Sequence, residues 1–152
     1  MKANFIPAVL PRDIRKLVAF DRKVFREADW FEPDDWKQYK SFWMVVSGKR
    51  VGCCAFAEHV PHRGSLYVAS TGILPASQRL GFGTLLKAWQ LAYARHHSFA
   101  RIVTNTRKSN RAMIALNKRF GFRVTATTPR HYADPVEPAI VMELILAPRR
   151  KP

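Results

Sequence analysis

Cysteine is scarce in this chain, and the only two that occur, Cys53 and Cys54, are adjacent. Successive residues of a strand point to opposite faces, so we expect no disulfide between them. The pair has no further ligands at metal-binding spacing, so we also expect no metal site. So few cysteines suit a reducing compartment, and we expect a cytoplasmic protein.

Long apolar runs are missing as well. No stretch approaches the roughly 20 residues that a membrane helix needs, and the N-terminal residues do not resemble a signal peptide. The 152 residues are 47% hydrophobic and include 10 Phe and 4 Trp, which predicts a packed globular protein. We expect a single domain over residues 1–147, followed by a disordered basic tail at residues 148–152.

Acidic residues are absent from the centre of the chain. No Asp or Glu occurs between His59 and Ala133, although the net charge is +15 and much of it lies in this span. The positive charge of this span would concentrate a polyanionic ligand. Alternatively, the same charge would bind the phosphates of a nucleic acid or the ribosome weakly. Five acidic residues cluster near the N-terminus instead: Glu27, Asp29, Glu32, Asp34 and Asp35.

Hydrophobic periodicity and turn residues predict a mixed α/β protein. Strands are expected at residues 5–10, 42–46, 51–58, 65–74, 101–104, 122–126 and 139–146. Helices are expected after Pro11, near residues 34–39, at residues 84–97 and after Ser109. A hairpin turn is expected at residues 61–64, and a proline-rich loop at residues 127–138.

The most informative segment is QRLGFG at residues 78–83, between an expected strand and an expected helix. Glycine lets backbone N–H groups approach a ligand closely, and the first turn of a helix offers unpaired donors at the positive end of its dipole. We therefore expect this turn to bind a phosphate or pyrophosphate. It matches neither the P-loop nor the dinucleotide-binding pattern.

Two blocks together resemble the GNAT superfamily of acyl-CoA N-acyltransferases. QRLGFG is similar to that family's Q-x-x-G-x-G loop, and NRAMIALNKRFGF at residues 110–122 to its N-x-x-[AM]-x-x-[LI]-[YN]-x-x-x-G-F block. The resemblance extends over roughly residues 5–146. It implies a GNAT-like α/β fold, with a central mixed sheet of six to seven strands flanked by about four helices. In that fold the fourth and fifth strands splay apart around the pantetheine arm of the coenzyme.

The resemblance also implies which residues bind acetyl-CoA, the co-substrate. Backbone amides from Arg79 to Thr84 would hold the pyrophosphate, with Gln78 shaping the turn. This set is Arg79, Leu80, Gly81, Phe82, Gly83 and Thr84. Main-chain groups of Ile73 and Leu74 would pair with the pantetheine amides. Asn110 is either a helix cap, a contact to the pantetheine arm, or both.

The expected catalytic positions depart from the family pattern. Asn117 stands where many relatives have a Tyr that protonates the departing thiolate, and its amide can only hydrogen-bond the sulfur. Tyr67 and Asn105 occupy positions where several relatives place a Glu that acts as the general base, and neither residue carries a carboxylate. Glu58 is the remaining candidate base, with Glu143 or a water relay as alternatives.

Candidate acceptor-binding residues come from two segments. RHYAD at residues 130–134 is similar to the Tyr-rich loop of ribosomal-protein and other protein N-terminal acetyltransferases, so Tyr132 either lines the acceptor slot or packs under the proline-rich turn. The acidic segment from Glu27 to Asp35 falls where the family places its first helix-to-helix loop, beside the acceptor entrance. We infer that its members, including Asp29 and Glu32, attract an ammonium group.

These expectations define an acetyl-CoA-dependent N-acetyltransferase. The acceptor is a primary amine, at a protein N-terminus or on a small molecule, and attacks the thioester directly. We expect no membrane partner and a monomer or homodimer. The alternative is a non-catalytic GNAT-fold module that docks on RNA or the ribosome through its basic face. The intact glycine turn favours the enzyme, because such a module has little use for it.

Overall fold

The computed structural model describes residues 2–58 and 63–146. The expected tail at 148–152 and residues 61–62 of the expected hairpin turn lie outside this part. The hydrogen-bonded strand order is β1-β2-β3-β4-β5-β7-β6, in a seven-stranded mixed sheet. The chain divides into two compact units, one made of residues 1–57 and 69–86 and the other of residues 58–68 and 87–152. The expectation of a single domain stays a prediction.

The first unit begins with antiparallel strands. It contains β1 (Ala3–Pro7), α1 (Ile14–Val24), the 3-10 helices η1 (Glu27–Asp29) and η2 (Asp35–Gln38), β2 (Lys40–Val46) and most of β3 (Lys49–Glu58). β1 pairs with β2, and β2 with β3, both antiparallel. The unit also holds the end of β4 (Ser65–Ile73), η3 (Pro75–Ser77) and the start of α2 (Phe82–His96).

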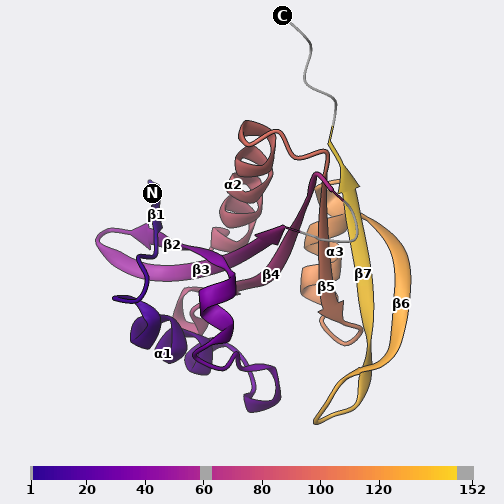
Figure 1. The fold of residues 1–152 in the computed structure, drawn as a ribbon, viewed down its shortest axis with the longest axis horizontal. Helices are drawn as coiled ribbons and strands as arrows, with labels where there is room; N and C mark the ends of the chain where they lie inside the picture. The colour runs from indigo at the N-terminus through magenta and orange to yellow at the C-terminus, as the bar shows by residue number, and fades with distance from the viewer. Residues whose placement is uncertain (1, 59–62, 147–152) are drawn as a thin grey trace, which may run out of the picture. The chain divides into compact units, whose positions relative to one another are not determined.

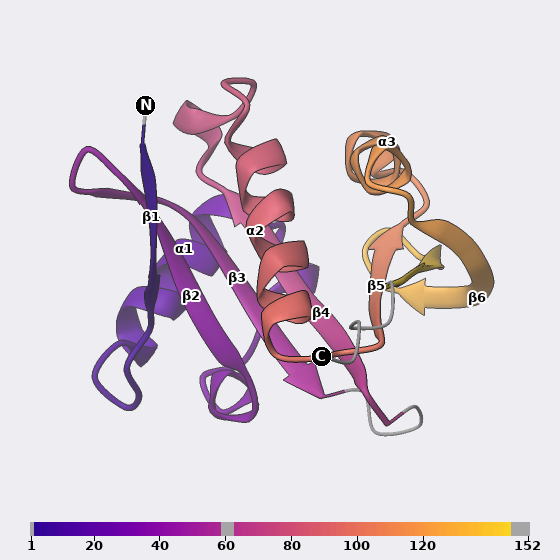
Figure 2. The same ribbon diagram turned by 90° about the horizontal axis from the view of Figure 1, so that it is seen from above.

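One face of this unit is closed by α1 (Figure 2). Leu17 and Phe20 of α1 are buried in one cluster with Trp43 of β2 and with Cys53 and Ala55 of β3. The rings of Phe20 and Trp43 meet edge to face, with centroids 5.7 Å apart. Burial of these large side chains fixes the helix against the strands.

The second unit is built on β5 (Arg101–Arg107), β6 (Arg123–Tyr132) and β7 (Glu137–Ile145), with the helix α3 (Arg111–Arg119) between β5 and β6 in the chain (Figure 1). The start of β4 pairs in parallel with β5, from Ser65↔Arg101 to Val68↔Thr104. β7 lies antiparallel between β5 and β6. The helix α3 packs on the face of β7 that carries Met142, through Asn117.

The expected mixed α/β fold class is confirmed: the central sheet is mixed and seven-stranded, and three α-helices occur among the described residues. The segment expected to form a second short helix is the 3-10 helix η2. Within residues 2–58 and 63–146, no helix is long and apolar enough to cross a bilayer.

The expected loop at residues 127–138 is wrong. β6 continues to Tyr132 and β7 starts at Glu137, which leaves only a four-residue turn. Pro129 does not interrupt β6 because this is an edge strand, exposed from Arg123 to His131, and an edge strand tolerates a residue without an N–H donor. The register shifts between Thr128 and Tyr132 take up the irregularity.

Candidate functional site

The glycine turn of the first unit has an unusual backbone. Gly81 has a φ of 85° and Arg79 a φ of 65°, a left-handed region that is unfavourable for arginine and easy for glycine. A Cβ atom added at Gly81 would meet no heavy atom within 4 Å. Glycine is therefore needed here for its dihedral angles, and the space beside its Cα is open.

This turn leads directly into the N-terminus of α2. The first helical hydrogen bond runs from the Leu85 N–H to the Gly81 carbonyl, at 3.2 Å. The N–H groups of Phe82 and Gly83 thus precede the helical ladder and have no carbonyl of the helix to bind. The first turn of this 15-residue helix has no acidic residue. The open space, the backbone donors and the helix dipole together fit a pyrophosphate group.

The end of β4 is tied to the same turn. Gln78 donates from Nε2 to the Ile73 carbonyl at 3.0 Å, while the Leu74 N–H donates to Val51 of β3 at 2.8 Å. Backbone groups alternate in direction along a strand. The N–H and C=O of Ile73 therefore point away from β3, and the N–H of Leu74 is already engaged.

In the second unit, Asn110 acts as a helix cap and Asn117 is fully buried. Asn110 Oδ1 accepts from the Met113 N–H at 3.2 Å, at the start of α3. Asn117 has no exposed surface, and its Nδ2 donates to Met142 Sδ at 3.7 Å. Among the described residues, Asn117 Oδ1 has no hydrogen-bond partner. A buried polar atom without a partner is costly in the free protein and suits one that receives a polar ligand.

Tyr132 packs against a buried arginine that sequence reasoning missed. The guanidinium carbon of Arg107, at the end of β5, lies 4.7 Å from the centre of the Tyr132 ring. Arg107 is only 6% exposed and also forms an ion pair with Glu137, at 3.4 Å. No sequence signal distinguishes it from the other arginines of this span, because its burial depends on the turn between β6 and β7.

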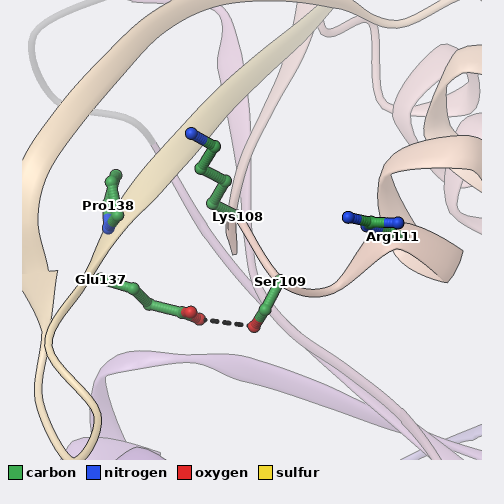
Figure 3. Close-up of a pocket in the computed structure, with 5 residues that line it drawn as sticks. All are labelled: Lys108, Ser109, Arg111, Glu137 and Pro138. Atoms are coloured by element: carbon green, nitrogen blue, oxygen red, sulfur yellow. Dashed lines mark hydrogen bonds between the residues drawn. The ribbon is translucent and has the colours of Figure 1, made fainter.

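A shallow hollow of about 360 Å³ lies beside this ion pair. Figure 3 shows Glu137 reaching across it to Ser109, with which it forms a hydrogen bond of 2.8 Å. Two exposed cations, Lys108 and Arg111, stand at its rim. The hollow therefore lies between the start of β7 and the segment that leads into α3.

The acidic candidates lie in three places. Glu58 is exposed at the end of β3, and Glu143 of β7 is paired with Arg101 at 3.3 Å. Asp29 lies 3.8 Å from Arg26, and the Glu32 N–H donates to Asp35 Oδ2 at 2.7 Å. Asn105 and Tyr67 lie on β5 and β4. In the part of the chain that the structure describes, no group of three His, Cys, Asp or Glu side chains could hold a metal ion.

Asp21 is a second residue that sequence reasoning missed. It is 2% exposed on α1, and its Oδ2 accepts from the Phe31 N–H at 2.8 Å. Burial raises the pKa of this carboxyl to about 6, although the Phe31 N–H acts in the opposite direction. Asp21 thus ties the acidic segment to the core of the first unit.

Comparisons with known proteins identify the family and the fold of the chain. Residues 12–122 match the model of the acetyltransferase (GNAT) family. No curated protein matches the chain in sequence. Three solved structures illustrate the shared fold, and each is under 20% identical to this chain.

The first of these is the ribosomal-protein-S18-alanine N-acetyltransferase of Escherichia coli, with 19% identity, a TM-score of 0.83 and 99% of each chain covered. A Bacillus subtilis acetyltransferase in complex with CoA has 15% identity and a TM-score of 0.80, over 96% of this chain and 100% of that one. The ribosomal-protein-alanine N-acetyltransferase of Brucella melitensis has 18% identity and a TM-score of 0.76, over 94% and 99%.

Proposed function

The chain belongs to the acetyltransferase (GNAT) family, and on this premise we propose that it transfers an acetyl group from acetyl-CoA to a primary amine by direct attack. The acceptor we favour is a protein N-terminus, with a small-molecule amine as the second choice. Two proteins with this fold, from Escherichia coli and Brucella melitensis, are named as N-acetyltransferases of a ribosomal-protein alanine. The observation that carries the proposal is the glycine turn at the start of α2.

Acetyl-CoA supplies an activated acyl group as a thioester. The residues proposed to hold its pyrophosphate are those from Arg79 to Thr84, where the backbone is open at Gly81 and no acidic residue opposes a negative charge. The N–H of Ile73, which points away from β3, is the proposed donor to the carbonyl oxygen as negative charge develops on it. Gln78 would fix the position of this strand end relative to the turn.

Proton transfer would involve two residues of the second unit. We assign Glu58 as the acceptor of the amine proton, through water, because no carboxylate stands at Tyr67 or Asn105. Asn117 would donate a second hydrogen bond from Nδ2 to the departing sulfur, beside the one that Nδ2 donates to Met142 Sδ. A free thiol has a pKa of about 8.5, so a thiolate stabilised by hydrogen bonds leaves without a dedicated acid.

The acceptor would meet two elements. Asp29 and Glu32 belong to the acidic segment proposed to attract the ammonium form of the amine. Since Arg26 already compensates Asp29 in part, most of the attraction falls to Glu32 and its neighbour Asp35. Tyr132, the last residue of β6 beside the β6–β7 turn, is the other proposed contact.

A basic docking module is the second candidate function. Its support is the basic span between His59 and Ala133 and the neutral side chains at positions 105 and 117. We expect ribosome or RNA contact to be weak and salt-dependent.

The location that we propose in the cell is the cytoplasm, since Cys53 and Cys54 are free thiols. We propose a monomer or a homodimer.

The test is thiol release from acetyl-CoA with a panel of amine acceptors. The panel contains short peptides that differ in their first residue, alanine included, and small polyamines and aminoglycosides. Cys53 and Cys54 are buried, and burial raises the pKa of the Cys53 thiol well above its ordinary value, so a thiol reagent reports coenzyme release rather than protein thiols. Release with a peptide supports the proposal. No release with any acceptor, together with salt-dependent RNA binding, would favour the module.

A further inference from the structure

The turn between β6 and β7 is assembled around the side chain of Arg107. Nη1 donates to the Pro135 carbonyl at 2.8 Å, and Nη2 to the Ala133 carbonyl at 2.6 Å. The same guanidinium lies over the ring of Tyr132 and pairs with Glu137. Arg107 therefore contacts both ends and the interior of the turn. A planar group with five N–H donors makes such a set of contacts, whereas a lysine ammonium cannot.

The backbone of this turn needs external support. Asp134 in the turn has a φ of 46°, and Arg130 near the end of β6 has a φ of 52°. Residues with a side chain adopt this left-handed backbone region far less readily than glycine, and they persist there only where the surrounding structure holds them. The carbonyls that Arg107 binds lie on both sides of Asp134, so these two hydrogen bonds fix the unfavourable residue between them.

Glu137 connects the same cluster to the segment that precedes α3. Its Oε1 is 3.4 Å from Arg107 Nη1 and 2.8 Å from Ser109 Oγ, as Figure 3 shows for Ser109. The Lys108 N–H also donates to the Pro138 carbonyl at 3.1 Å. Buried charge of either sign is costly unless it is paired, and here the guanidinium and the carboxylate compensate each other. These contacts hold the turn against the end of β5.

The turn presents side chains outward rather than into a core. Val136 at its tip is 65% exposed. Tyr132 at its base is partly exposed, and Arg107 beneath is hidden. An ordered exposed turn suits recognition, because a binding partner then loses less conformational entropy on contact.

We propose that Arg107 is a positioning residue, which holds the β6–β7 turn (residues 133–136) and Tyr132 in the shape that binds the amine acceptor. This inference rests on the proposed acetyl transfer and adds a determinant of acceptor affinity to it. Arg107 acts through the turn and does not itself touch the acceptor. Acetyl-CoA affinity should therefore not depend on Arg107.

The chain offers a matched control on the same two strands. Arg101 pairs with Glu143 of β7 at 3.3 Å and lies at the end of β5 opposite to Arg107. Arg101→Lys replaces the guanidinium of an ion pair of the same kind by an ammonium. Arg107→Lys makes the same replacement, but a single ammonium cannot also keep both carbonyl hydrogen bonds. Glu137→Gln is the second test variant, because it takes the charge out of the cluster while its amide oxygen still accepts from Ser109.

The experiment compares the three variants with the wild-type protein. The acceptor probe is the panel peptide that gives the fastest wild-type thiol release. We expect Arg107→Lys to raise the KM for this peptide about tenfold, because a disordered turn must be ordered again when the peptide binds. The dissociation constant for acetyl-CoA should change by less than about twofold. Backbone NMR order parameters of Ala133, Asp134 and Val136 should fall from about 0.85 towards 0.6. Arg101→Lys should match wild type in all three measurements.

Each other outcome counts against the inference. An unchanged peptide KM with a mobile turn shows that the turn does not bind the acceptor, and unchanged order parameters show that Arg107 does not hold it. If Arg107→Lys does not fold, Glu137→Gln decides, with the same expected direction and a smaller change. Absence of wild-type turnover with every acceptor overturns the proposed function and this inference together. Wild-type turnover with unaltered KM in both variants overturns this inference alone.

Discussion

Gln78 donates a hydrogen bond from its side chain to the carbonyl of Ile73, at 3.0 Å. This bond joins the glycine turn to the last residue of β4. The turn proposed to bind pyrophosphate and the strand end proposed to bind the acyl and pantetheine part of acetyl-CoA are thereby fixed to each other, within one compact unit.

Removing this bond should weaken acetyl-CoA binding. We expect Gln78→Leu to raise the dissociation constant for acetyl-CoA three- to tenfold, about the worth of one hydrogen bond plus the loss of turn order. Isothermal titration measures it. Gln38→Leu, an exposed glutamine of η2 in the same unit, serves as the control. Equal affinities for both variants would show that Gln78 does not organise the site.

Asn117 should trade stability for activity. Its Oδ1 is buried and has no partner among the described residues, so the near-isosteric Asn117→Leu should keep the free energy of unfolding or raise it by about 1 kcal/mol. If the Asn117 amide hydrogen-bonds the departing sulfur of coenzyme A, the same variant should lower kcat at least tenfold. Chemical unfolding and thiol release measure the two effects.

Ser65→Ala is the matched control for Asn117→Leu. Ser65 Oγ is likewise buried without a partner in the described part of the chain, but no catalytic role is proposed for it. Ser65→Ala should leave kcat unchanged. A destabilised Asn117→Leu with full activity would mean that Asn117 is structural.

Asp21 should make the free energy of unfolding depend on pH. Its pKa of about 6 in the folded protein exceeds the usual value of 3.8, so the folded state binds more protons than the unfolded state between these values. The free energy of unfolding should then fall as pH rises from about 4 to 6, by at most on the order of 3 kcal/mol. Asp21→Asn should lack this fall and be more stable than wild type at pH 8.

Asp13→Asn provides the opposite sign. The hydrogen bond from Arg12, together with one from the Val9 N–H, lowers the pKa of Asp13 to about 2. Its contribution is complete above about pH 4 and is lost only as pH falls through 2. Asp13→Asn should therefore be less stable than wild type at both pH 5 and pH 8. Urea unfolding at these pH values tests both residues, and parallel pH profiles for wild type and Asp21→Asn would contradict the assignment to Asp21.

Glu58 is testable through the pH dependence of catalysis. General-base assistance is commonly worth a factor of about 100, so Glu58→Gln should lower kcat/KM by that order. It should also shift the profile towards the pKa of the acceptor amine, about 8 for a peptide N-terminus. Rates within threefold of wild type, with an unaltered profile, would assign the proton to bulk water instead.

The elements around the glycine turn were predictable because short-range signals define them. The strand expected at residues 65–74 is β4, which ends at Ile73, and the helix expected at 84–97 is α2, from Phe82 to His96. Apolar alternation, a proline and two glycines mark these borders locally. The same holds for Asn110, whose capping role is visible in the structure.

The β6–β7 turn and its support were not predictable in this way. Pro129 suggested a loop, and only the edge position of β6 explains why the strand continues. The roles of Arg107 and Asp21 depend on backbone groups 10 or more residues away in the sequence, at Pro135 and Phe31. Burial of a charged side chain follows from such tertiary contacts, which composition and periodicity do not encode.

The central claim, that the glycine turn binds the pyrophosphate of acetyl-CoA, is tested most directly by titrating the coenzyme into three proteins. Gly81→Glu places bulk and negative charge in the open space of the turn, and Gly48→Glu makes the same change at another open, left-handed glycine of the same unit, with a φ of 76°. We predict micromolar binding by wild type and Gly48→Glu, and none detectable by Gly81→Glu. Undiminished affinity in Gly81→Glu, or no binding by wild type, would contradict the account.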